Sequence, residues 1–352
     1  MPPLARGGGP AVGWWKGIQM DIIVIGGINI DIEGSPFAAL LDRDSNPGTV
    51  SIAYGGVGRN IAENLARLGQ SVGMVSVVGS DELGKGAKEH LAGLGADTSM
   101  IRTIEGAGSC IYLSILDENM DMKLAVNDME IIKEITPGYI RENLAEISKA
   151  KAIALDANLD EAALEEITAM LTGANEPAET GEPCGLGRTG KPDDLDAASK
   201  PNCPKLFLDP VSASKAPRTI SSIGRFHSIK PNLIEAEAIS GMEIHNQADL
   251  VAAADWFLEC GVENVYITLG KEGVYYKNRE KDGYILPKKE LKLVSATGAG
   301  DAFSAMVLTG MAEDLDIEEI ARLGMAASEL AMESKKAVNE KIDIDEIKRR
   351  IL

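Results

Sequence analysis

The sequence predicts an α/β protein in which a central, mostly parallel sheet lies between two helical layers and a small separate β sheet forms a lid. Short aliphatic runs such as DIIVIGG, from Asp21, alternate with helical segments such as RNIAENLARL at 59–68. This alternation is typical of βαβ units. It breaks at 109–126, where SCIYLSIL and MKLAV flank the polar DENMD at the spacing of a β-hairpin.

The individual elements follow from local patterns. The helix at 59–68 places Ile61, Leu65 and Leu68 on one face, and Gly69 follows at the position of a C-cap. The short segment TVSIAY, at about 48–54, joins the hairpin in the predicted lid. The remaining predicted elements are SVGMVSVVG, DELGKGAKEHLAGLG, AIALDANL, a helix from about 161, KLFLDPV, FHSIKPN, a helix through 235, another near 249–260, NVYITLG, VYYK, LKLVS and AFSAMVLTGMA.

One main domain is expected from 20 to 352, since α/β folds of this length often remain a single domain. Residues 1–19 precede the first folded pattern and are expected to be a disordered extension. The stretch 174–204 is rich in Pro, Gly, Asp, Glu and Thr and has almost no aliphatic residues. Such a segment buries too little surface to order itself, so we expect a disordered insertion.

Charge restricts the possible partners. The chain has 352 residues and a formal net charge of -19, which would repel a phosphate backbone and an anionic membrane surface, so neither nucleic acid nor membrane is an expected partner. No apolar run reaches the roughly 18 residues that span a bilayer, and residues 1–19 lack the apolar stretch of a secretion signal. An anionic nucleotide would bind only where backbone N–H groups and a few cations create a local positive field.

Cysteine and histidine usage indicates a cytoplasmic protein without a transition-metal site. The cysteines are widely scattered and are read as reduced thiols, and the histidines share no metal-ligand spacing. These residues are Cys110, Cys184, Cys203, Cys260, His90, His227 and His245.

The strongest chemical motif is TGAGD at 297–301, between LKLVS and an apolar helix. Small residues let a phosphate approach the backbone, and the N–H groups at a helix start point toward it. Asp301 falls in the first turn of that helix, where a carboxylate could take a proton from an attacking hydroxyl. An ordinary glycine-rich turn with Asp at a helix start is the alternative.

A second glycine-rich turn, GGVGRN at 55–60, opens the helix at 59–68 and suits the close approach of a polyol, with Asn60 able to donate and accept hydrogen bonds. A tight turn without a ligand is the alternative. Asn29 and Asp31 stand two apart, so an extended backbone directs both side chains to one face. They follow the first buried strand, where open α/β sheets bind ligands; a polar strand end that faces water is the alternative.

Two weaker motifs follow. Asn232 and Glu235 lie one helical turn apart, and an amide with a carboxylate suits a hydrated Mg²⁺ on a nucleotide; a capping pair at a helix start is the alternative. The turn TLGKEG at 268–273 ends a strand where a nucleotide could lie against bare backbone.

In this order GGVGRN, NLIE, TLGKEG and TGAGD resemble the motifs of the ribokinase-like carbohydrate kinases, the PfkB family, from Met20 to about Ala337. Longer segments resemble the pseudouridine kinases within that family: DSNPG, GGVGRNIAENLARLG, AVNDM, DPVSASK and IKPNLIEAEAISG. The resemblance implies the ribokinase-like three-layer α/β/α fold, with the small β sheet as a lid that closes over the sugar and excludes water.

The resemblance also implies residue roles. The catalytic base corresponds to Asp301 and the anion hole to Gly298, Ala299 and Gly300. The residues implied for sugar binding are Asp31 and Asn60, with Asn29, Gly55 and Gly56 beside them, and Asn158 is a further candidate. The residues implied for ATP and Mg²⁺ are Thr268, Gly270, Gly273, Thr297, Asn232 and Glu235. Many relatives have an acidic residue that helps to bind a monovalent cation where this chain has Ser295, so a cation requirement stays open.

The reaction that we expect is transfer of the γ-phosphate of ATP to the 5′-hydroxyl of pseudouridine. Asn127 and Asp128, just past the second hairpin strand, could meet the polar edge of the base, with a hairpin-exit turn as the alternative. A kinase for another nucleoside or sugar (ribose, adenosine, fructose) and a non-catalytic nucleoside sensor are the other hypotheses. The exposed edges of a small lid sheet make a homodimer through the lid possible.

Overall fold

The computed structural model describes residues 20–173, 203–288 and 293–351. The expected extension at 1–19 lies outside these residues. So does the expected insertion at 174–204, apart from its last two residues.

A nine-stranded sheet forms the centre of the protein, in the order β13-β12-β11-β10-β9-β8-β1-β4-β5. All neighbours from β11 to β5 are parallel, and the antiparallel pairs involving β12 lie at one edge. This confirms the predicted mostly parallel sheet. The strands are β1 (Ile22–Ile25), β4 (Val72–Gly79), β5 (Ile101–Ile104), β8 (Ala152–Asp156), β9 (Lys205–Asp209), β10 (Ser228–Ile229), β11 (Asn264–Thr268), β12 (Val274–Lys277) and β13 (Asp282–Ile285).

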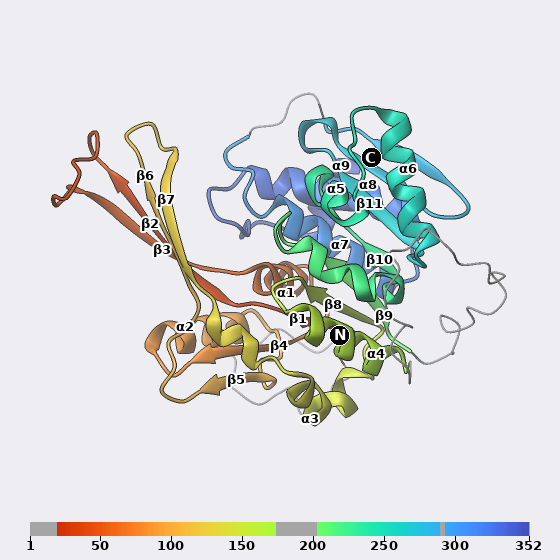
Figure 1. Ribbon diagram of the computed structural model, residues 1–352, viewed down its shortest axis with the longest axis horizontal. Coiled ribbons are helices and arrows are strands. Elements are labelled where there is room, and N and C mark those ends of the chain that lie inside the picture. Colours follow the sequence, from red (N-terminus) through yellow and green to blue (C-terminus); the bar gives the residue numbers. More distant parts are fainter. Residues whose placement is uncertain (1–19, 174–202, 289–292, 352) are drawn as a thin grey trace.

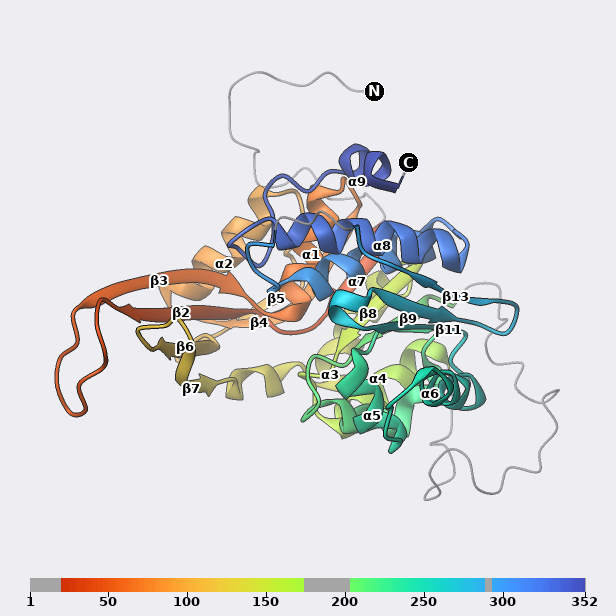
Figure 2. The ribbon, with the colours of Figure 1, turned by 90° about the horizontal axis from the view of Figure 1, so that it is seen from above.

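Helices cover both faces of this sheet, as Figure 2 shows from above. Alternation along β1 feeds two cores: Ile22 and Val24 pack with α1, α7 and α8, whereas Ile23 and Ile25 pack with α3, α4 and α6. The three-layer α/β/α arrangement follows. The helices are α1 (Val57–Arg67), α2 (Glu82–Gly93), α3 (Pro137–Ile147), α4 (Glu161–Thr172), α5 (Leu233–Ser240), α6 (Gln247–Glu259), α7 (Ala299–Ala312), α8 (Ile317–Met332) and α9 (Ile344–Ile351).

A separate four-stranded sheet, the lid, extends from one side of the main body (Figure 1). Its order is β3-β2-β6-β7, with β2 (Asn29–Pro36), β3 (Gly48–Gly55), β6 (Ile111–Leu116) and β7 (Met122–Asp128). The predicted lid strands are present, but the sequence analysis missed β2. Asn29 and Asp31 therefore begin a lid strand rather than end a strand of the main sheet, because the chain leaves the main sheet after Ile25 and pairs with β3 and β6.

The strand expected at LKLVS is wrong for its described part. Residues 293–298 carry no strand, since the N–H groups of Val294 and Ser295 both donate to the carbonyl of Met332, at 2.8 and 3.2 Å. These bonds hold the segment against the end of α8 instead of against a neighbouring strand.

Candidate active site

The site lies where the chain order of the main sheet reverses. The chain runs from β1 outward through β4 and β5 and returns to the other side of β1 with β8, so the carboxyl ends of β1 and β8 border a switch point, where open α/β sheets bind ligands. Asp156 ends β8, and its Oδ2 accepts hydrogen bonds from the N–H groups of Gly27 at 2.9 Å and Gly58 at 3.1 Å. These bonds tie the loop after β1 to the start of α1.

The lid meets this edge at Asp31. Asn29 Nδ2 donates to Asp31 Oδ1 at 2.5 Å, and a Cβ on Gly55 would lie only 2.1 Å from Asp31 Oδ2. Glycine is therefore needed at position 55 for the carboxylate to sit against the backbone of the neighbouring strand. Burial raises the pKa of Asp31, opposed by the bond from Asn29 and the charge of Arg59.

The TGAGD turn forms the other side of the site. Gly298 is the N-cap of α7 with φ 80°, and a Cβ there would lie 1.7 Å from the carbonyl oxygen of Ala337. This close approach explains why the turn needs glycine. The helix begins at Ala299, so the first N–H groups of α7 point out of its end with the positive end of the helix dipole.

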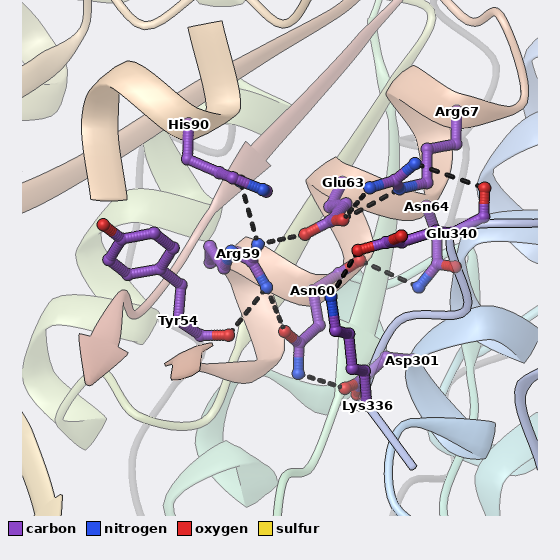
Figure 3. A network of polar contacts seen from close by, with 10 residues as sticks. All are labelled: Tyr54, Arg59, Asn60, Glu63, Asn64, Arg67, His90, Asp301, Lys336 and Glu340. Carbon is purple, nitrogen blue, oxygen red and sulfur yellow. Dashed lines mark hydrogen bonds and ion pairs between the residues drawn. The ribbon is translucent and has the colours of Figure 1, made fainter. Parts of the chain in front are cut away.

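Asn60 and Asp301 join the two sides. Asn60 Nδ2 donates to Asp301 Oδ2 at 2.8 Å, although the residues are 241 positions apart (Figure 3). Burial raises the pKa of Asp301 to about 7, and the carboxylate of Asp209 adds to the rise, while Asn60 and Lys230 oppose it. A carboxyl group with this pKa can accept a proton near neutral pH.

Lys230 is a site residue that the sequence analysis missed. Its side chain is 6% exposed, and Nζ lies 3.4 Å from Asp209 Oδ2 and 3.3 Å from where a Cβ on Gly300 would stand. Burial lowers the pKa of Lys230, but the nearby carboxylates, including Glu235 and Asp301, outweigh burial and raise it. The site thus holds a buried cation beside the glycine turn, and its only signal in the sequence is its place two residues before Asn232.

Asn232 and Glu235 form the capping box that the sequence analysis gave as the alternative. The Asn232 side chain accepts from the N–H of Glu235, and the Glu235 side chain accepts from the N–H of Asn232, both at 2.9 Å. Thr268 lies beside this helix start, because its N–H donates to the carbonyl of Pro231 at 2.9 Å. The turn carrying Gly270 (φ 60°) and Gly273 (φ 92°) follows directly, whereas Thr297 is an exposed residue of the glycine turn.

Asn127 and Asp128, the two candidates for contact with a base, lie on opposite faces of the lid. In the lid, Asp31 pairs with Tyr112 and Tyr112 pairs with Asn127, so these three side chains form a row on one face. Asp128 alternates to the opposite face, and its Oδ1 accepts from the N–H of Glu130 at 3.4 Å. Contact of either residue with a base stays a prediction.

Asn158 follows β8 at the same edge of the sheet as Asp156. Its N–H donates to Asp156 Oδ1 at 3.0 Å, and its Oδ1 accepts from Lys215 Nζ at 2.5 Å. The amide is therefore held in one orientation by Lys215 and by the carboxylate of Asp156.

The described part of the chain holds neither a metal-binding cluster nor a membrane-spanning helix. In 20–173, 203–288 and 293–351, no three or more His, Cys, Asp or Glu side chains gather in a way that could hold a metal ion. No helix in that part of the chain is both long and apolar enough to cross a membrane. Cys110 and Cys203 are free thiols.

The fold and the site define a small-molecule kinase of the ribokinase-like class. The chain belongs to the pfkB family of carbohydrate kinases, whose model matches residues 19–177 and 194–344. Pseudouridine kinase from Escherichia coli is 32% identical over 92% of this chain and 94% of its own length. Guanosine-inosine kinase from Exiguobacterium acetylicum is 27% identical over 92% and 98%. The fold matches that of Arabidopsis thaliana ribokinase, solved with ribose and ATP, with a TM-score of 0.76 at 19% identity over 95% of this chain and 99% of the other.

Proposed function

We propose that this protein transfers the γ-phosphate of ATP to the 5′-hydroxyl of pseudouridine, giving pseudouridine 5′-phosphate and ADP. The observation that carries the proposal is the contact between Asn60 and Asp301, which joins a polyol-type turn to a phosphate-type turn in one site. The 32% identity with a pseudouridine kinase over nearly the whole chain supports the choice of substrate.

In this proposal Asp31 and Asn60 hold the ribose hydroxyls. The Asp31 carboxylate accepts hydrogen bonds, and its fixed place against Gly55 leaves it little freedom to move. The ribose then lies between the lid and Asp301, with its 5′-hydroxyl toward that carboxylate.

Asp301 takes the proton of the 5′-hydroxyl as the oxygen bonds to the γ-phosphorus. The bond between the γ-phosphorus and the oxygen that bridges to the β-phosphate breaks, and ADP leaves with that oxygen. The N–H groups at the start of α7, with Gly298, Ala299 and Gly300, stabilise the charge on the transferring group, and Lys230 adds a fixed positive charge.

The residues present fit a hydrated magnesium ion. The capping box uses Oε2 of Glu235 and Oδ1 of Asn232. Glu235 Oε1 is left to accept from a water on Mg²⁺, which keeps several of its waters in nucleotide sites, and Asn232 Nδ2 is left to donate to a phosphate oxygen. Bound there, the ion would neutralise charge on the phosphates. Thr268, Gly270, Gly273 and Thr297 would border the nucleotide.

A nucleoside suits the lid better than a free sugar does. The row of Asp31, Tyr112 and Asn127 continues past the ribose position with an aromatic ring and an amide. A ring can pack against a base, and an amide can both donate to and accept from the two polar edges of a uracil joined through carbon.

A panel of acceptors tests the substrate. We expect kcat/KM for pseudouridine to exceed that for uridine, inosine, adenosine, ribose and fructose by at least about tenfold, since an unpaired polar group in a site costs about 1–3 kcal/mol. ADP release measures turnover. In Asn127→Ala the preference for pseudouridine over ribose should fall, while turnover of ribose stays constant. Faster turnover of ribose or inosine than of pseudouridine would refute the substrate assignment, and a protein that binds nucleosides but releases no ADP would be a sensor.

We also propose that two copies pair through the lid. The face opposite Asp31 is apolar and exposed: Val50 is 70% exposed, Ile52 60%, Leu113 37%, Leu124 51% and Val126 62%. Cross-strand pairing places these side chains on one surface. A contiguous apolar patch of this kind marks an interaction site, and a second lid presents the same surface.

Ile52→Glu is expected to convert a dimer into a monomer, because it places a charge in the centre of the apolar face. Sedimentation velocity measures the mass. Ile234→Glu is the matched control, since Ile234 is 62% exposed but lies on α5. A monomeric wild-type protein, or a dimer that persists in Ile52→Glu, would refute pairing through the lid.

A further inference from the structure

Arg59 is a buried cation that the reaction described above does not use. Its side chain is 4% exposed. Nη1 donates to the carbonyl oxygen of Tyr54 at 2.8 Å and to Asn60 Oδ1 at 2.9 Å. Nη2 pairs with Glu63 and lies 3.3 Å from His90 Nδ1. Figure 3 shows the guanidinium between the end of the lid strand and the Asn60 amide, which in turn reaches Asp301.

We propose that Arg59 is a positioning residue that holds the Asn60 amide in the single orientation that donates to Asp301, and that fastens this amide to the end of lid strand β3. The inference rests on the kinase function proposed above and adds a residue to its site. An amide has one accepting and one donating end, and a guanidinium only donates. With Oδ1 bound to Arg59, Nδ2 must face the carboxylate. In the flipped amide, Nδ2 would face the donor Nη1 of Arg59 and Oδ1 would face the acceptor Oδ2 of Asp301, so both hydrogen bonds would be lost.

The link to the lid comes from a shared donor. Tyr54 is the next-to-last residue of β3, and the same Nη1 bonds both to its carbonyl and to Asn60. The Arg59 side chain is thus a rigid connection between β3 and the Asn60 amide. β3 pairs with β2, the strand that carries Asp31. Lysine cannot reproduce the whole arrangement, because one ammonium cannot stand both where Nη1 makes these two bonds and where Nη2 pairs with Glu63.

Glu63 is the nearest charge partner of Arg59 and acts on it more strongly than Asp301 does. Glu63, whose side chain is 4% exposed, pairs with Arg59 on one side and with Arg67 at 2.8 Å on the other. His90 on α2 and the carboxylates of Asp31 and Asp301 complete the charged and titratable groups that act on Arg59. The guanidinium can therefore serve as a fixed donor rather than as the counterion of the catalytic carboxyl.

A double-mutant cycle between Arg59 and Asn60 tests the proposal on the full chain. With the best acceptor of the panel, Arg59→Met and Arg59→Lys are expected to lower kcat by about 30-fold or more, the range found for misplaced catalytic groups. In an Asn60→Ala background the same changes should lower kcat by less than about threefold, because the amide that Arg59 orients is gone. Arg102→Met is the control, since Arg102 lies over the ring of Tyr139, as Arg59 lies over the ring of Tyr54, but outside the site.

A second measurement does not depend on turnover. Without substrate, the carbon NMR titration of the Asp301 carboxyl should move to higher pH in Arg59→Met and move less when Asn60 is already Ala. If Arg59→Met does not fold, Arg59→Met/Glu63→Gln neutralises the buried carboxylate that the first change leaves with Arg67 as its remaining cation. Equal losses in both backgrounds, or full kcat in Arg59→Lys, would overturn the proposal. The titration needs no substrate, so it tests the role of Arg59 even if the acceptor panel refutes pseudouridine as the substrate. The proposal on Arg59 and the proposed function can therefore fail separately.

Discussion

Replacing Asp301 with Asn is expected to lower kcat by about 10²–10⁴-fold, the usual contribution of a general base. The amide cannot accept the proton of the attacking hydroxyl, yet its oxygen can still accept the bond from Asn60, which is 2.8 Å away in the native site. Nucleoside binding, measured by calorimetry, should therefore stay within about threefold of the wild-type affinity. Unchanged turnover would show that this carboxylate is not the base.

The same substitution is expected to stabilise the protein at alkaline pH. In the folded protein the pKa of Asp301 is raised from 3.8 to about 7, so the folded state favours the protonated carboxyl. That contribution to stability is fully present below about pH 4 and is lost as the pH rises through about 7. Asn removes the charge, so the free energy of unfolding at pH 8 should rise by about 1–3 kcal/mol, and the gain should vanish near pH 4.

Denaturant unfolding between pH 4 and 8 measures this effect. Asp121→Asn is the control, because Asp121 is an exposed residue of the lid loop and its substitution should change the free energy of unfolding by less than about 0.5 kcal/mol. A gain in Asp301→Asn that does not depend on pH would contradict the raised pKa.

Replacing Lys230 with Met is expected to lower the free energy of unfolding by about 3–5 kcal/mol, as found when one partner of a buried ion pair is removed. Asp209, whose side chain is 5% exposed, would lose the ammonium at 3.4 Å and keep the hydroxyl of Ser304 at 2.8 Å. The pKa of Asp301 should rise further because Lys230 lowers it in the native site. The acidic limb of the pH profile of kcat/KM should therefore move to higher pH.

Thermal or denaturant unfolding and the pH profile measure the two effects of Lys230→Met. Lys133→Met is the control, since Lys133 is 63% exposed and its ion pair with Glu130 should contribute less than about 1 kcal/mol. If Lys230→Met does not fold, Lys230→Met/Asp209→Asn should regain part of the stability but not the activity. A variant as stable as the wild type would show that the ammonium does not compensate these carboxylates.

The sequence was sufficient for the fold class and for the two glycine turns. Buried parallel strands are continuous aliphatic runs, and a glycine turn before a helix leaves a pattern in consecutive residues, as GGVGRN and TGAGD do. The strand at LKLVS was predicted wrongly because an apolar run alone does not show what its backbone will bond to. The N–H groups of Val294 and Ser295 donate to the end of α8 and not to a neighbouring strand. β2 was missed although NIDIEG alternates, because one of its two partners, β6, is distant in the chain.

The residues Asp31, Asn60 and Asp301 were predictable by type because each lies in or beside a short motif whose local geometry the chain itself sets. The contact between Asn60 and Asp301, and the places of Lys230 and Arg59 beside it, were decided only by the tertiary structure. A single lysine or arginine carries no local pattern, and its meaning depends on which carboxylates and carbonyls the packed helices bring within hydrogen-bonding distance. The physical reason is burial. Removal of water makes these charges depend on one another, and burial is a property of the folded chain and not of the order of residues in the sequence.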